Sequence, residues 1–447
     1  MEFKDKWYII IPIICFFGWA FISLLKDKFY IYDATDFDML YYASKNMFTN
    51  PGEVYTNFPS DRYYYAPAFA TIFGVIVFLS SFEISIWFLF GALLVIGVLI
   101  ILEFDKILKL YNIDNIFIRF LFLFVIANGH SIMINFDFMQ TKLFVIYFLL
   151  LFLRREIQHR KSNKNLAKNN NRFLFWQIMI FVFGIGLVPQ YAIFLIIVYF
   201  LYNISIREIF IRQQLKKYGL FILVFLIQNF MFIIIFIANP KTISYILEGF
   251  IGIGNRYFST DITINEIVNQ SKFLPLDLLS LFIYSISFLI GVPIIDTFFL
   301  TIISLIIMFI LIIILVLNKR LEIEEKFGYI AFFSLLFNTF YHGRDRVILI
   351  PLTALLFIIK VYERDDILKF IKKNMVWLIG LGTLLLINLY PRMFFILRVF
   401  TFLEIIPLGI LLLAVCLIYI IMGFCILKLR KFDIISTFRK NSIDLNN

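Results

Sequence analysis

The chain has 447 residues, of which 62% are hydrophobic and 16% are charged, and its mean hydropathy is +0.92. Soluble globular domains carry about 25% charged residues, so this composition excludes them and indicates a membrane protein that crosses the bilayer several times. The formal net charge of +11 comes from Lys and Arg clustered beside hydrophobic runs, which favours topology and anionic lipid over nucleic acid as the explanation. The three cysteines lie in apolar runs and predict neither disulfides nor a zinc site.

Apolar runs of membrane-crossing length recur from residue 7 to residue 427 and leave no room for a sizeable soluble domain. We therefore expect one all-α membrane domain over residues 1–447, located in the cell membrane. The first run, residues 7–25, has no small-residue cleavage site. It predicts an uncleaved first helix rather than a signal peptide.

The distribution of Lys and Arg predicts which connections face the cytoplasm, because short loops rich in these residues are retained there. Residues 154–172 hold seven Lys or Arg against one Glu. The same argument assigns to the cytoplasm residues 207–217, 318–326 and 364–373 and the tail 428–447. The polar loops 27–67 and 239–277 are then external, and both termini are cytoplasmic.

Several apolar segments are too short to cross the membrane alone. At about 1.5 Å per residue, a segment of about 15 residues falls short of a hydrocarbon core of ~30 Å. We expect residues 66–80 to dip into the outer leaflet, and residues 278–290 are interfacial or crossing. Other short segments pair around polar hinges: 116–127 with 142–153, 173–187 with 191–202, and 330–340 with 347–361. Because lipid does not tolerate exposed polar backbone, their outer ends predict a water-filled cavity.

The longer runs predict full crossings, which brings the expected total to about 12. These runs are residues 84–103, 219–238, 296–317, 375–390 and 401–427. Residues 162–171 are the low-complexity patch of the chain and predict a disordered loop.

The external loop 27–67 holds three carboxylates within six positions, Asp33, Asp36 and Asp38. One such carboxylate suffices as the general base of an inverting sugar transfer, where it takes the proton of the acceptor hydroxyl. Short Asp runs are more often solvated turn formers, but the tyrosines that follow suit sugar stacking as well as a membrane interface. Asp36-Phe37-Asp38 also has DxD spacing, but without a soluble nucleotide-binding domain we expect no metal.

Ionisable residues between two half-spans form the second candidate site, in the run YHGRDR at 341–346. Arg344 and Arg346 could bind a phosphodiester, and His342 could donate a hydrogen bond to its oxygen. An external hinge whose arginines anchor at head groups explains the run equally well. Weaker candidates, each more often a helix cap or a surface anchor, are His130, Asp137, Gln140, Arg256, Lys272 and Arg392.

The order of the aromatic motifs resembles a known family. Asp36-Phe37 is followed by Tyr41-Tyr42-Ala43, Val54-Tyr55 and Tyr65-Ala66-Pro67. This order resembles the first external loop of glycosyltransferase family 87, the polyprenol-phosphate-mannose-dependent mannosyltransferases of the GT-C superfamily. Later runs resemble further family features in the same order: Gln140-Thr141, Asn269-Gln270-Ser271, and His342 before a helix with Pro351. Each motif alone is weak, and their order and spacing carry the resemblance over residues 30–355.

The resemblance implies a GT-C-like fold with about 12 transmembrane helices and a catalytic external loop after the first helix. It implies transfer of a hexose, in that family mannose, from a polyprenyl-phosphate-linked donor to a glycan or glycolipid acceptor without a cofactor. Asp36 is then the base because Ala43 keeps its spacing from Asp36, while an extra residue after Phe37 leaves Asp38 open. The implied substrate-binding residues are Asp38, Tyr41, Tyr65, Gln140, Asn269, Lys272, His342, Arg344 and Arg346.

Two other hypotheses belong to different functional classes. A secondary transporter or lipid flippase would also use broken helices, but it predicts two related halves, and no second copy of the loop pattern is visible. A structural subunit without catalysis predicts that the carboxylates of the external loop are dispensable.

Overall fold

The computed structural model describes residues 6–26, 35–55, 67–137, 139–162, 170–187, 189–201, 212–245, 278–290, 297–318, 320–337, 346–358, 367–399 and 408–430. Every regular element in these segments is helical, which confirms the predicted all-α class. Three helices contain an apolar stretch long enough to cross a membrane: α1 (Trp7–Lys26), α4 (Phe82–Leu110) and α19 (Leu408–Arg430). Two bent helix pairs raise this number to five. The chain is therefore a membrane protein, and the figure of about 12 crossings stays a prediction.

The described chain contains further helices before, between and after these three. In the first half they are α2 (Thr35–Thr49), η2 (Pro51–Glu53), α3 (Pro67–Leu79), α5 (Ile116–Ala127), α6 (His130–Asp137), α7 (Lys142–Ser162), α8 (Asn170–Ile185) and α9 (Pro189–Leu201). In the second half they are α10 (Arg212–Gln228), α11 (Met231–Ala238), α14 (Leu278–Ile290), α15 (Thr297–Leu317), α16 (Ile323–Phe337), α17 (Arg346–Ala354), η5 (Leu355–Phe357) and α18 (Ile367–Val399).

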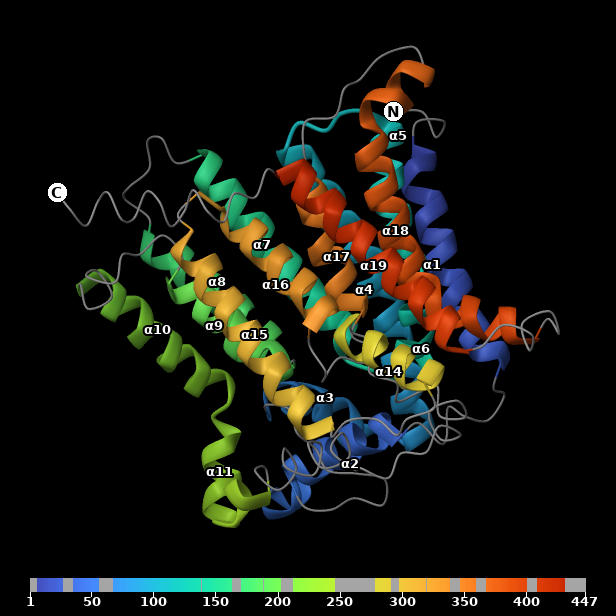
Figure 1. The fold of residues 1–447 in the computed structure, drawn as a ribbon. Coiled ribbons are helices and arrows are strands. Elements are labelled where there is room, and N and C mark those ends of the chain that lie inside the picture. The colour runs from blue at the N-terminus through green and yellow to red at the C-terminus, as the bar shows by residue number, and fades with distance from the viewer. Residues whose placement is uncertain are drawn as a thin grey trace.

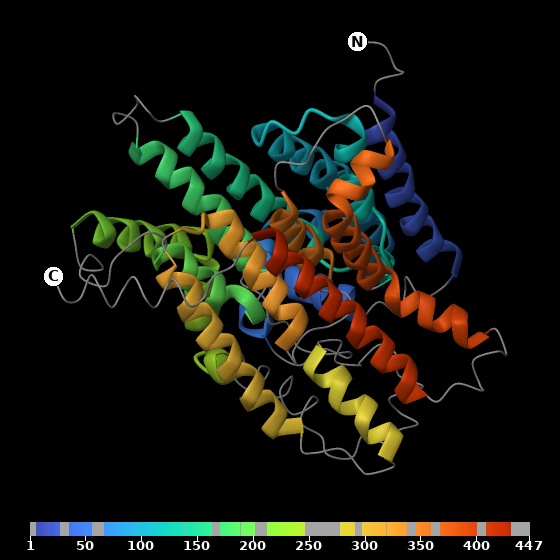
Figure 2. The same cartoon turned by 45° about the horizontal axis from the view of Figure 1, so that its top comes forward.

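Successive helices run up and down one bundle, so their ends gather at two opposite ends of the molecule (Figures 1 and 2). At the end that we call the basic end, α4, α7 and α19 finish and α5, α8 and α16 begin. At the other end, which we call the hinge end, α2, α3 and α11 lie, and α5 is joined to α6. The core between them is apolar and rich in Phe, Ile and Leu.

The exposed charges are sorted between the two ends. Exposed Lys and Arg at the basic end of the described chain are Lys6, Lys106, Lys109, Lys161, Arg172, Lys216, Arg320, Lys372, Lys373 and Lys428. Exposed charges at the hinge end, in the same described part, are Lys45, Glu53, Glu83 and Lys241. By the positive-inside rule, this sorting supports a cytoplasmic basic end and an external hinge end.

The external loop 27–67 contains a helix that the sequence analysis did not predict. Phe37 of α2 packs edge-on against Phe73 of α3 and Phe82 of α4, with ring centroids 6.2 and 5.0 Å apart. Tyr41, one turn later, lies 4.9 Å from the Phe82 ring. These contacts bury one face of α2, so Asp36 and Asp38 lie on a packed helix rather than on an open loop, while Asp33 lies outside the described residues.

The predicted crossing at 219–238 is wrong as a single helix, because α10 and α11 bend by 62° at a short break. The side chain of Asn229 stabilises the break. Its Nδ2 donates to the Phe225 carbonyl at 3.0 Å, and its Oδ1 accepts from the Ala68 N–H at 3.3 Å. Because Ala68 is in the first turn of α3, Asn229 satisfies an amide that has no acceptor within its own helix.

Other boundaries differ from the prediction where polar residues continue a helix. α7 extends to Ser162 and α8 begins at Asn170, so much of the basic loop 154–172 is helical. α16 begins seven residues before position 330. α18 extends beyond 375–390 at both ends, but it is kinked at Asn374, directly before the predicted start of that crossing. The predicted helices at 116–127 and 278–290 match α5 and α14. α3 and α14 have 13 residues each, about 20 Å at about 1.5 Å per residue, so neither spans a full hydrocarbon core alone.

The orientation can be tested with single cysteines in a background where Cys15, Cys416 and Cys425 are Ala. In intact cells, we expect a membrane-impermeant maleimide to label Glu53→Cys directly. We expect it to label Lys161→Cys only after permeabilisation, because the two positions are exposed at opposite ends of the bundle. Labelling in the reverse order would contradict the assignment of the basic end to the cytoplasm.

Candidate functional site

The first polar hinge, between α5 and α7, is built around an asparagine of α18. The Ser131 hydroxyl donates to Oδ1 of Asn388 at 2.8 Å. Nδ2 of Asn388 donates to the Asn128 carbonyl at 2.7 Å and to the Val125 carbonyl at 3.3 Å. α5 and α6 bend here by 40°, and the carbonyls freed by the bend are satisfied by α18 rather than by water.

Gly129 is required at this hinge for steric reasons. A Cβ at this position would lie 2.2 Å from the side chain of Asn388, far inside van der Waals contact. The close approach of the hinge backbone to α18 therefore depends on the missing side chain.

Arg346, the first residue of α17, contacts the same turn of α18. Its side chain is fully buried. Nη1 donates to the Ile387 carbonyl, and Nη2 lies 3.4 Å from the Tyr419 hydroxyl of α19. Because Ile387 adjoins Asn388, one turn of α18 joins the hinge to the start of α17. The structure thus brings Arg346, predicted from the run 341–346, close to the hinge that contains Gln140.

The side chain of Gln140 is the polar group in this region with the fewest hydrogen bonds. It is 2% exposed, and within the described residues neither its Nε2 nor its Oε1 has a hydrogen-bond partner. The backbone is well ordered by contrast: the Gln140 N–H donates to the Asn135 carbonyl at 2.8 Å, and Met139 adopts a left-handed φ of 48°. An unpaired buried amide group costs about 1–3 kcal/mol, so its retention calls for an explanation.

Helix α2, which carries Asp36 and Asp38, lies at the same end as this hinge. Asp36 is the second residue of α2, and Asp38 is partly buried one residue after Phe37. Tyr41 packs against Phe82, and burial raises the pKa of its hydroxyl, with Tyr42 and Glu83 adding to the rise. Its ring is therefore engaged in packing. The predicted site residues that fall outside the described part are Tyr65, Asn269, Lys272, His342 and Arg344.

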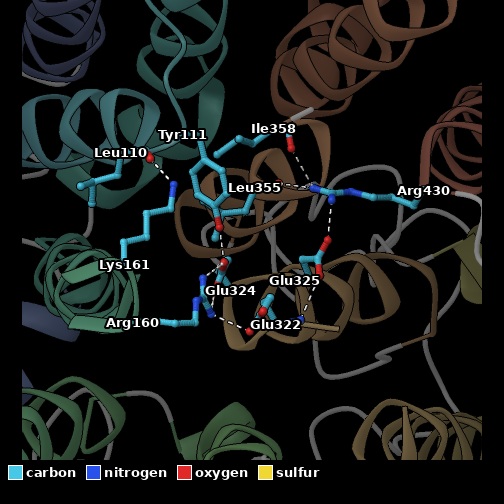
Figure 3. A network of polar contacts seen from close by, with 10 residues as sticks. All are labelled: Leu110, Tyr111, Arg160, Lys161, Glu322, Glu324, Glu325, Leu355, Ile358 and Arg430. Atoms are coloured by element: carbon cyan, nitrogen blue, oxygen red, sulfur yellow. Dashed lines mark hydrogen bonds and ion pairs between the residues drawn. The ribbon is translucent and has the colours of Figure 1, made fainter. Parts of the chain in front are cut away.

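The sequence analysis missed a network of ion pairs at the basic end (Figure 3). Arg160 of α7 donates to Glu322 at 2.7 Å and to Glu324 at 2.6 Å. Arg430 of α19 pairs with Glu325 and donates to the Leu356, Leu355 and Ile358 carbonyls at 2.6, 3.0 and 3.2 Å. The sequence did contain a signal for this network, because three Glu residues lie within the basic run 318–326. The positive-inside rule counts only Lys and Arg, so it identifies this run merely as a cytoplasmic loop.

These charges surround a cleft of about 270 Å³ and bind one another across it. The Tyr111 hydroxyl donates to Glu324, and Lys161 lies 4.4 Å from the Tyr111 ring while donating to the Leu110 carbonyl. Burial raises the pKa of Tyr111, and Glu324 adds to the rise, so Tyr111 keeps its proton as a donor. This basic-end network joins the ends of five elements. Because its charges bind one another and the carbonyls of helix ends, we assign it a structural role.

A second buried ion pair lies nearby. Arg119 of α5 donates to Asp105 of α4 through Nε at 2.7 Å and to the Tyr8 hydroxyl of α1 at 2.6 Å. Both charged side chains are less than a tenth exposed. This triad aligns the starts of α1 and α5 with the end of α4.

Metal ligands do not gather in the described part of the chain: no group of three or more His, Cys, Asp or Glu residues there could hold an ion. A mechanism without metal stays a prediction.

Comparisons with known proteins give no match to this chain. No family model matches it, and no curated protein or solved structure is similar. The resemblance to family 87 therefore stays a prediction from the order of the motifs.

Gly129→Ala should destabilise the protein, because the new methyl group displaces Asn388 and breaks its hydrogen bonds to the hinge. We expect a loss of about 2–4 kcal/mol, combining overpacking with lost hydrogen bonds, measured as a fall in the unfolding midpoint in detergent. Gly382→Ala is the matched control, since a Cβ there meets open space. Equal midpoints for the two variants would contradict this view of the hinge.

Arg430→Gln tests the basic-end network. The change leaves Glu325 without its partner and removes the donors for three carbonyls, so we expect a loss of about 1–3 kcal/mol, the cost of leaving partly buried hydrogen-bonding groups unsatisfied. Lys428→Gln, an exposed position on the same helix, should leave the unfolding midpoint unchanged. An equal fall of the unfolding midpoint in both variants would show that the loss of a positive charge, and not the loss of the basic-end network, is the cause.

Proposed function

We propose that this protein is a membrane glycosyltransferase. In this proposal it transfers a hexose, mannose by the family resemblance, from a polyprenyl-phosphate-linked donor to a glycan or glycolipid acceptor outside the cytoplasm. The observation that carries the proposal is the clustering at the hinge end. The fully buried Arg346 contacts the turn of α18 that binds the first hinge, and Gln140, whose side-chain amide has no partner within the described residues, belongs to that hinge. The acidic helix α2 is at the same end.

The reaction is a single displacement. The acceptor hydroxyl oxygen attacks the anomeric carbon, the bond from that carbon to the phosphate oxygen breaks, and the polyprenyl phosphate leaves with the bonding electron pair. Asp36 takes the hydroxyl proton, with Asp38 as the alternative base. Because a phosphate monoester is already a stable anion, cationic and hydrogen-bonding groups suffice to stabilise it.

The predicted residues take different roles in this scheme. His342 and Arg344 would contact the donor phosphate, with Lys272 assisting. Tyr65 and Asn269 would line the sugar subsite. The hydrogen bonds of Arg346 to α18 and α19 favour a positioning role for that residue, because they hold the start of α17 against the hinge.

A secondary transporter or lipid flippase is the alternative. The bent pairs α5–α6 and α10–α11 favour it, since broken helices line the transport sites of many such proteins. The two proposals separate on covalent chemistry, because transport leaves the lipid-linked sugar intact.

The test is sugar transfer by purified protein from a polyprenyl-phosphate-linked hexose, comparing Asp36→Asn with wild type at equal expression. We expect the variant to lose about 10²–10⁴-fold in rate, the usual contribution of a general base. Asp38→Asn identifies which acid is the base, and Glu53→Gln, an exposed acid at the same end, is the control. Transfer at the wild-type rate by the Asp36 and Asp38 variants, separately and together, would refute the catalytic role. Substrate counter-flow in proteoliposomes without transfer would favour the transporter.

A further inference from the structure

Helix α11 is fastened to the external helices at both of its ends. Before its start, Asn229 lies in the break that follows α10, and its Oδ1 accepts from the Ala68 N–H of α3 at 3.3 Å. At its end, Asn239 is the C-cap residue, and its Nδ2 donates to the Gly52 carbonyl of η2 at 2.9 Å. The two asparagines therefore join α11 to two different elements of the external region.

The elements that α11 contacts form one packed unit with α2. A Cβ at Gly74 of α3 would lie 2.7 Å from the Ser44 carbonyl oxygen of α2, so these two helices cross in direct contact. η2 follows α2 after a single residue. We call α2, η2 and α3 the outer unit. Asp36 and Asp38 lie on its first helix, so a displacement of the outer unit moves both carboxylates.

Apolar contacts also hold the outer unit against the bundle. Phe37 and Tyr41 pack against Phe82 of α4. Phe69 of α3 packs edge-on against Phe144 of α7, with ring centroids 5.1 Å apart. The hydrophobic effect that favours these contacts is not directional, so small sliding between helices costs little. A hydrogen bond weakens steeply when its geometry changes, and the two asparagines therefore restrict such sliding.

α11 links the outer unit to the bundle, because it continues from α10, which packs against α8. Its buried face is short and contains Met231 and Ile235, one turn apart. Phe232 adds a ring contact to Tyr55 of the external region, with centroids 5.9 Å apart. Ile237 is 74% exposed and faces the surroundings of the bundle. A buried face this short leaves the place of α11 dependent on the hydrogen bonds at its ends.

We propose that Asn229 and Asn239 are positioning residues, which set the place of the outer unit and thereby the place of Asp36 and Asp38. The catalytic consequence rests on the proposed function, whereas the placement of the outer unit does not. A general base must lie within hydrogen-bonding reach of the hydroxyl that it deprotonates, and a displacement of about 1 Å can cost about 10²-fold in rate. In this scheme the asparagines act through α11 and the outer unit, without touching substrate.

The place of the outer unit can be measured without an assay of activity. Nitroxide labels are attached to Lys45→Cys of α2 and Lys372→Cys of α18, which are exposed at opposite ends of the bundle. The full chain, in the cysteine-free background used for the labelling test, is reconstituted in nanodiscs. We expect pulsed EPR to give one narrow distance distribution, and Asn229→Leu and Asn239→Ala each to broaden or shift it. An unchanged distribution in the double variant would overturn the inference.

Gln228, the neighbour of Asn229 in the same break, supplies a matched control. Its Nε2 donates to the Met179 carbonyl of α8 at 2.8 Å, so Gln228→Leu removes a hydrogen bond of the break but none to the outer unit. We expect this variant to be less stable and to keep the wild-type distance distribution and the wild-type kcat. A distribution as broad as that of Asn229→Leu would overturn the specific role of the asparagines.

The transfer assay distinguishes a positioning role from a structural one. Asn229→Leu and Asn239→Ala should each lower kcat by about 10²-fold and leave the KM for the donor nearly unchanged, because only the base is displaced. Asn229→Asp should restore most of kcat, since its carboxyl oxygen still accepts from the Ala68 N–H. If Asn229→Leu does not fold, Asn239→Ala, at a half-exposed position, supplies the test. A higher KM at unchanged kcat would contradict the positioning role.

The outcome is separable from that of the proposed function. A displaced outer unit in the asparagine variants, in a protein without transfer activity, would support the role of α11 and contradict the transferase. Transfer that depends on Asp36, with kcat and the EPR distance distribution unaffected by Asn229→Leu and Asn239→Ala, would do the reverse.

Discussion

The arrangement of this bundle depends on one constraint: a polar group removed from water inside a membrane protein needs a partner from the protein itself. Two breaks in the described helices meet it with a specific side chain. Asn388 binds the carbonyls freed between α5 and α6, and Asn229 binds both its own helix and the first turn of α3. Arg346 does the same for the Ile387 carbonyl in α18. These partners fix where the helices bend and which helices meet there.

The same constraint separates the two ends of the molecule. At the basic end, the charges of Arg160 and Arg430 are paired with carboxylates and further satisfied by carbonyls. At the hinge end, Gln140 and Thr141 keep polar atoms without partners in the described structure. A region with satisfied groups is rigid, whereas unsatisfied groups lower stability and gain from a ligand. We therefore propose that the chemistry of the chain lies at the hinge end and that the basic end has a supporting role.

Part of this structure follows from the sequence pattern, and part depends on contacts far along the chain. Periodicity and length predict α5 and α14 correctly, because their bounds coincide with changes from polar to apolar residues. The break at Asn229 has no such signal, since residues 219–238 are almost all apolar and the bend depends on the amide of Ala68. α2 was missed because its buried face needs Phe73 and Phe82 from other helices. For the site, hydropathy indicated the hinges at 128–141 and 341–346. The turn of α18 that joins them carries an ordinary Asn within an apolar run.

Among the described helices that run between the two ends, α7, α17 and α19 take part in contacts at both of them. α7 begins beside Gln140 and carries Arg160 near its other end, and α17 begins with Arg346 and leads through η5 to the carbonyls that Arg430 binds. α19 carries both Tyr419 and Arg430, so it contacts each end of α17. Interlocking the far ends of α7 and α19 restricts sliding along the bundle, which would otherwise move the start of α7 relative to the start of α17. The residues of a group-transfer site must be held within about 0.5 Å of the productive geometry, and loops alone are not rigid enough for this. The paired charges at the basic end therefore help to hold the hinge end in a fixed arrangement.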